Sequence, residues 1–158
     1  MEFLKETFSN PVVLAAIFGW CVAQVSKCII YMIINKRFTL ERMVGGGGMP
    51  SSHSATVCAL CTAVGMTEGG GSTLFAVCVA FSFIVMYDAM NVRLETGKQG
   101  KVINDMLEVF KSMDLKFMMD KDISPEKKLK ELVGHTPLQV LVGAIVGIVV
   151  AYITVKYI

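Results

Sequence analysis

The stretch GGGGMPSSHS, residues 45–54, joins a glycine-rich loop to an apolar run, and the rest of the chain is organised around it. The residues that follow are mostly apolar and predict a helix that begins near the serines. Ser51 or Ser52 can cap this helix with its hydroxyl oxygen, and Pro50 suits the helix entry because proline has no N–H to lose. The first amides of a helix lack partners and carry partial positive charge, so the stretch predicts an anion site with His53 beside it. A capped helix that holds no ligand is the simpler alternative.

Composition indicates a single, unusually apolar domain. The chain has 158 residues, of which 54% are hydrophobic, well above the share in a soluble domain. The 15 basic and 13 acidic residues nearly balance, which argues against a nucleic-acid partner. The five cysteines lie in apolar segments, and their odd number argues against a disulfide framework. Cys58 and Cys61 form a CxxC with no second pair or nearby histidine, so we expect neither a bound metal nor a cofactor.

Four apolar segments are long enough to predict membrane helices, because about 20 helical residues cross a hydrocarbon core. The expected fold is an all-α, polytopic membrane bundle of about four transmembrane helices in one domain, residues 1–158. The spans are expected near residues 11–34, 51–67, 72–90 and 135–157. The first ten residues show no signal-peptide pattern.

A polar segment, residues 91–134, separates the third and fourth spans. It carries nine basic and eight acidic residues among scattered apolar ones. We expect part of it to be helical and to lie along the membrane surface, with a break at Ser124 and a charged helix over Pro125–Leu132.

The basic residues predict the orientation of the spans. Twelve of the 15 lie in the polar segment or in the loop 35–50, whereas only Lys5 and Lys156 lie at the other end of the spans. The positive-inside rule therefore predicts a plasma-membrane protein with both basic loops in the cytoplasm and both termini on the opposite side.

On this topology the unusual polar residues gather at the cytoplasmic face. They are Lys27, Arg37, Arg42, Ser52, His53, Asp88, Arg93 and His135. Ionisable residues in or beside membrane spans cost free energy and usually mark function. Two imidazoles near one phosphate suggest a nucleophile and a general acid, while lysine and arginine neutralise the phosphoryl group.

The fourth span carries a stripe of residues spaced by four, which share one helix face. In this stripe Gln139 can accept a hydrogen bond from the His135 ring and so fix which ring nitrogen carries the proton. Gly143 and Gly147 form a GxxxG pattern, which lets another helix approach closely. Helix capping by His135 and simple packing by the glycines are the plainer alternatives.

Three motifs resemble the divergent branch of the type-2 phosphatidic acid phosphatase family, which is related to vanadium haloperoxidases. They are GGMPSSHS (47–54), DAMNVR (88–93) and GHTPLQVLVGAIVG (134–147), and the resemblance extends from Lys27 to Gly147. It implies an all-α, metal-free phosphatase with a phosphohistidine intermediate. The element Pro50-Ser51-Ser52-His53 is similar to the family's PSGH, which implies that His53 is the general acid. His135 is similar to the nucleophile, and Lys27 to the lysine of the first motif.

The sequence departs from the family pattern at several positions. The carboxylate four residues after the nucleophile is Gln139 here, and Asp88 could supply the missing charge. Leu129 stands where an arginine is expected, so Arg93 is the first substitute, with Lys128 or Lys130 as alternatives. Ile34 stands where the first motif has its arginine, and Arg37, then Arg42, can replace it. The wider family has six spans, so a homodimer could complete the bundle.

These observations predict a membrane phosphatase that acts on a lipid or prenyl phosphate or diphosphate at the cytoplasmic leaflet. The expected catalytic residues are His135, His53, Asp88 and Gln139, and the expected phosphate-binding residues are Lys27, Arg37, Gly47, Gly48, Ser51, Ser52 and Arg93. A protein that binds or transports a lipid phosphate with the same pocket is the alternative, since Gln139 brings no negative charge. A purely structural membrane subunit is the third.

Overall fold

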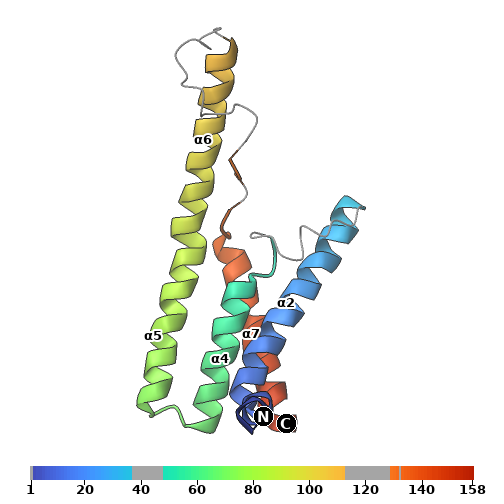
Figure 1. Cartoon of the computed structure of the whole chain (residues 1–158), viewed down its shortest axis with the longest axis vertical. Helices are drawn as coiled ribbons and strands as arrows, with labels where there is room; N and C mark the ends of the chain where they lie inside the picture. The colour runs from blue at the N-terminus through green and yellow to red at the C-terminus, as the bar shows by residue number, and fades with distance from the viewer. Residues whose placement is uncertain (1, 37–47, 113–128, 132) are drawn as a thin grey trace.

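The computed structural model describes residues 2–36, 48–112, 129–131 and 133–158, and in these ranges all regular structure is helical. The elements in chain order are α1 (Glu2–Ser9), α2 (Pro11–Asn35), α4 (Ser52–Thr67), α5 (Thr73–Tyr87), a π-helical turn (Asp88–Val92), α6 (Arg93–Ser112) and α7 (Pro137–Tyr157). Helices α2, α4, α5 and α7 lie side by side as a bundle (Figure 1). The predicted all-α membrane bundle is therefore confirmed.

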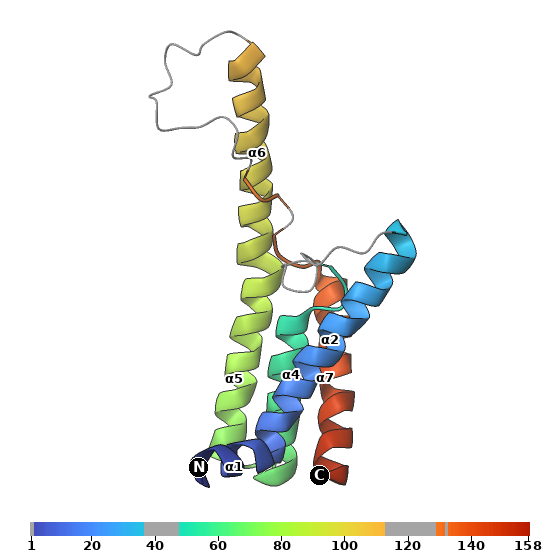
Figure 2. The same cartoon turned by 45° about the vertical axis from the view of Figure 1, so that its right-hand side comes forward.

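Three of the described helical stretches are long and apolar enough to cross a membrane. They are Pro11–Asn35, Thr73–Phe110 and Pro137–Tyr157. The remaining bundle helix, α4, has 16 residues and is about 24 Å long at 1.5 Å per residue. Both chain termini lie at one end of the bundle, and the first turns of α4 and α7 lie at the other (Figures 1 and 2).

The caps of α4 and α7 explain where these helices begin. The Ser51 hydroxyl oxygen accepts a hydrogen bond from the Ser54 amide at 3.4 Å, so Ser51 rather than Ser52 caps α4. Pro50 immediately precedes the cap, at the entry to the helix. Thr136 and Gln139 form a reciprocal capping box at the start of α7.

The bundle is held by contacts at the level of the backbone, where α2, α4 and α7 all pack against one another. A Cβ atom on Gly147 would overlap the Ala55 carbonyl oxygen, and one on Gly143 would overlap that of Ser51. Helix α2 approaches the same part of α4, since a Cβ atom on Gly19 would lie 2.9 Å from the Ala59 Cβ and 3.0 Å from the Ala55 carbonyl oxygen. The close approach predicted from the GxxxG pattern is therefore present, and α4 is its partner.

Helix α6 corrects the expected course of the polar segment. It continues the axis of α5 and projects beyond the bundle (Figure 1), instead of lying across the end of the bundle. The π-turn widens the helix without ending it. The charged helix expected over Pro125–Leu132 is absent at 129–131, where the chain has no helical structure, and the rest of that range, 125–128 and 132, lies outside the described residues.

The glycine contacts generate a stability prediction. Replacing Gly147 with alanine should lower the free energy of unfolding by about 1–3 kcal/mol, because the added methyl group pushes α7 away from α4. Gly70 is the matched control, since a Cβ atom there meets nothing within 4 Å. Unfolding in mixed detergent, followed by circular dichroism, measures both variants. Equal stability of the two would contradict the packing described above.

Candidate functional site

The two histidines meet at the end of the bundle that is remote from the termini. His53 lies in the first turn of α4, and His135 lies just before α7. Their ring centroids are 5.8 Å apart and their planes meet at 66°. Among the described residues, the buried Nδ1 atom of His53 has no hydrogen-bond partner. Two helix starts that are far apart in sequence thus place two imidazoles at one spot.

Hydrogen bonds fix the tautomer of His135, whose side chain is only 1% exposed. Its Nδ1 atom lies 3.1 Å from the Gly48 carbonyl oxygen and 3.3 Å from the Gln139 Oε1 atom. Both oxygens are acceptors, because Oε1 also accepts a hydrogen bond from the Thr136 amide at 3.1 Å. Nδ1 therefore carries the proton, and the neutral ring keeps a lone pair on Nε2. The contact with Gln139 was predicted from the spacing; the one with Gly48 was not.

Burial lowers the pKa of His135 from its ordinary value of 6.5, because a desolvated imidazole resists charging. The hydrogen bond with Gln139 acts in the opposite direction, and the positive charge of Lys27 lowers the pKa further. The neutral form of His135 therefore dominates at pH 7.

Lys27 brings a positive charge to both rings. Its side chain is 3% exposed on α2, and its charge acts on His53 and on His135. Gly48 lies against its aliphatic stem, since a Cβ atom at this glycine would be 3.3 Å from the Lys27 Cγ. Gly48 also has a φ of +88°, which favours glycine. The end of the glycine loop is thus shaped to lie between Lys27 and the His135 ring.

Ser51 and Ser52 lie at the start of α4, next to His53 in the chain, and both are buried. The Ser51 amide donates a hydrogen bond to the Gln139 carbonyl oxygen at 3.0 Å, so the first residues of α4 are tied directly to α7. Ser52 opens α4, where the helix dipole is positive. This arrangement holds the two histidine-bearing helix starts in register.

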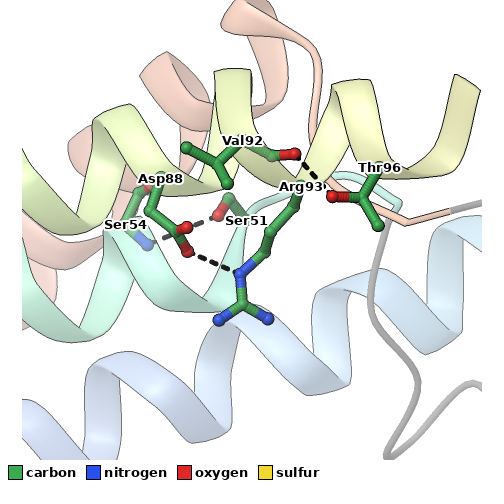
Figure 3. A network of polar contacts seen from close by, with 6 residues as sticks. All are labelled: Ser51, Ser54, Asp88, Val92, Arg93 and Thr96. Carbon is green, nitrogen blue, oxygen red and sulfur yellow. Dashed lines mark hydrogen bonds and ion pairs between the residues drawn. The ribbon is translucent and has the colours of Figure 1, made fainter. Parts of the chain in front are cut away.

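Asp88 does not take the place expected for it beside His135. Its Oδ2 atom accepts a hydrogen bond from Arg93 Nε at 2.6 Å, as Figure 3 shows. In the described part of the chain, the recorded partners of the His135 ring are Gly48 and Gln139 instead. The charges of Asp88 and Arg93 act on the other imidazole, that of His53.

The segment that leads to His135 is held against α6 by residues that the sequence analysis missed. Asn104 is 4% exposed; its amide nitrogen donates to the Leu129 carbonyl oxygen at 3.0 Å, and its Oδ1 accepts from the Leu129 amide at 3.0 Å. Gly97 and Gly100 let the segment approach, since a Cβ atom on Gly97 would overlap the Glu131 carbonyl oxygen. The i, i+3, i+7 spacing of Gly97, Gly100 and Asn104 is the signal that could have revealed this face.

The remaining predicted residues are placed as follows. Arg37, Arg42, Gly47 and Lys128 lie outside the described residues. Lys130 is exposed beside α6. Within the described ranges there is no group of three or more histidine, cysteine or acidic side chains that could hold a metal ion.

Comparisons with known proteins agree with this architecture. Residues 8–150 match a family model described as the divergent PAP2 family. The chain is also 37% identical, over 153 residues, to a protein of Bacillus subtilis (strain 168) described as the uncharacterized membrane protein YuiD. That alignment covers 94% of this chain and 96% of the relative. No solved structure matches the chain.

The Asn104 contacts generate a prediction about local stability. Replacing Asn104 with alanine leaves the Leu129 amide and carbonyl without these partners, which costs about 1–3 kcal/mol. Residues 129–131 should then exchange amide hydrogens faster, as measured by mass spectrometry. Gln99→Ala, an exposed position on the same helix, is the control and should leave the exchange unchanged. Equal exchange in both variants would show that Asn104 does not hold the segment.

Proposed function

The chain belongs to the divergent PAP2 family, and we propose that it is a membrane phosphatase that hydrolyses a phosphorylated lipid or prenyl carrier. The observation that carries the proposal is the His135 ring, which is neutral, protonated on Nδ1, and 5.8 Å from the His53 ring. A nucleophile and a proton donor at this separation can act on one phosphorus centre.

The proposed reaction has two steps. The Nε2 lone pair of His135 attacks phosphorus, the bond from phosphorus to the lipid oxygen breaks, and His53 gives that oxygen its proton. His53 then takes a proton from water, the water oxygen attacks the phosphohistidine, and inorganic phosphate leaves. The Nδ1 proton of His135 stays with its acceptors Gly48 and Gln139 throughout, so these hydrogen bonds stabilise the ring as it gains charge.

Positive charge around the rings supports the binding of an oxyanion. Lys27 and Arg93 both act on His53, and the start of α4 adds the positive end of a helix dipole. Ser51, Ser52 and the amides of Gly47 and Gly48 belong to the proposed phosphate-binding set, as does Arg37.

A protein that binds or transports a lipid phosphate is the second candidate, and one observation favours it. Both acceptors on the His135 Nδ1 atom are neutral, because Gln139 is an amide and Gly48 offers a carbonyl. A neutral acceptor stabilises the imidazolium less than a carboxylate does, so the phosphohistidine step would be slow.

The proposal places the site at the cytoplasmic face. Helix α2 ends, and α4 and α7 begin, at the end of the bundle where the histidines meet, and both termini lie at the other end (Figure 1). In the sequence, one basic segment follows α2 and the other precedes α7. The positive-inside rule supports this orientation.

The test is phosphate release from a panel of lipid and prenyl phosphates by the purified protein. His135→Asn should reduce the rate by about a thousandfold or more, because it removes the nucleophile. Asparagine can still donate a hydrogen bond to Gly48, so the fold should survive, which the melting temperature checks. His53→Ala should also lose turnover, whereas Gln99→Ala should not.

Each outcome of this test is informative. Turnover that persists in His135→Asn would reject the proposed nucleophile. Lipid-phosphate binding without phosphate release by the unaltered protein would select the binding or transport function. Activity in inside-out but not right-side-out vesicles is expected, and the reverse result would overturn the orientation.

A second prediction concerns the Gln139→Glu variant, which keeps the capping box because glutamate serves it equally well. The added negative charge should raise the pKa of His135, since an opposite charge favours the imidazolium. The nucleophile is active when neutral, so in the unaltered protein activity falls as the pH drops through a pKa below 6.5. In the variant this decline should begin at a higher pH, while the rate at high pH rises. A pH profile that does not move would contradict the assigned contact.

A further inference from the structure

The helix from α5 to α6 widens at one place, and this widening brings Asp88 and Arg93 together. In an α-helix, residues five apart lie about 140° from each other around the axis, so their side chains point in different directions. Here the Arg93 amide donates to the Asp88 carbonyl oxygen, which is the i→i+5 bond of a π-turn. The turn sets the two side chains one above the other, with Nε and Oδ2 at 2.6 Å.

The same turn also anchors the backbone of His135. An extra residue in a helical turn leaves one carbonyl without its usual i+4 partner. The Ala89 carbonyl oxygen accepts a hydrogen bond from the His135 amide at 2.9 Å. Gly134, with a φ of +90°, lies so close to α6 that a Cβ atom there would overlap the Leu94 amide nitrogen. The π-turn therefore binds the backbone amides of both Arg93 and His135 through its carbonyl oxygens.

The guanidinium of Arg93 contacts Asp88 through one of its edges. Its Nε contacts Asp88, and Figure 3 shows its two terminal nitrogens pointing away from that carboxylate. A guanidinium has five donors in a fixed plane, so it can hold a carboxylate with one edge and an oxyanion with another. Arg93 also lies beside the residue before His135, since a Cβ atom on Gly134 would be 2.7 Å from the Arg93 carbonyl carbon, and the charge of Arg93 acts on the His53 ring.

We infer that Asp88 is a positioning residue that acts through Arg93, by fixing the guanidinium so that its free edge meets an oxyanion bound between the histidines. The inference rests on the anion site of the proposed function, but it does not require turnover. Asp88 would then act on Arg93 and not, as the sequence suggested, as the carboxylate partner of His135.

The experiment measures binding of orthovanadate to the purified full-length chain in four forms: unaltered, Asp88→Asn, Arg93→Gln and the double variant. Removing a carboxylate near an anion site should by itself tighten anion binding. The positioning role predicts the opposite, a loss of about tenfold in Asp88→Asn, which is a usual coupling for residues in one hydrogen-bond network. Once Arg93 is replaced, Asp88→Asn should change the affinity by less than about twofold.

The matched control is Glu95→Gln, which removes the carboxylate of an exposed ion pair with Lys98 on the same helix. It should leave vanadate binding unchanged, and Asp88→Glu should recover part of the lost affinity. Melting temperatures of all variants separate a general loss of fold from a loss of positioning.

Three results would overturn the inference. They are unchanged or tighter binding in Asp88→Asn, an equal loss in the Arg93→Gln background, and no vanadate binding by the unaltered protein. The last of these would also remove the anion site itself. Vanadate binding with the predicted pattern but no phosphate release from any lipid would leave the inference standing while the proposed phosphatase activity failed.

Discussion

The site depends on how closely α4 packs between its neighbours. The carbonyl oxygens of Ser51 and Ala55 occupy the space where side chains would stand at Gly143 and Gly147 of α7. Lipid tails are as apolar as the helices, so association within a bilayer relies on such backbone proximity rather than on a hydrophobic driving force. Because the contact begins at the first residues of α4, it also brings His53 to the start of α7. The contact that packs α4 against α7 therefore also brings the two histidines together.

A second constraint is the electrostatic cost of the site. Lys27 is almost fully buried in a membrane helix, where a charge is expensive. Arg93 adds a second cation, and Asp88 binds its Nε atom. Such charges are retained beside membrane spans when they serve a ligand or a pathway. The tautomer of His135 agrees with this reading, because its Nδ1 proton is committed to Gly48 and Gln139 and its Nε2 atom is left for chemistry.

The sequence predicted much of the fold, because apolar length, glycine spacing and caps are local signals. It also predicted that Gln139 contacts His135, since residues four apart on a helix are neighbours. It could not predict the π-turn, because a regular helix places Asp88 and Arg93 on different sides, and nothing in DAMNVR marks the extra residue. The Gly48 carbonyl was missed because backbone atoms leave no trace in residue types. Asn104 was missed because its partner, Leu129, is 25 residues away and pairs through its backbone.

Gln139 joins these features in a single residue. Its side-chain oxygen accepts from the Thr136 amide and from the His135 ring, and its carbonyl oxygen accepts from the Ser51 amide. A glutamate could make the same three contacts, since it has the same length and serves capping boxes equally well. The start of α7 therefore does not require an amide at position 139. The amide differs from a carboxylate in its electrostatic effect on the His135 ring. Burial lowers the pKa of the His135 ring and the charge of Lys27 lowers it further, while its neutral acceptors raise it less than a carboxylate would. The ring therefore keeps Nε2 free but stabilises a positively charged intermediate less. In the proposed function, the choice between fast turnover and tight binding thus depends on one acceptor atom.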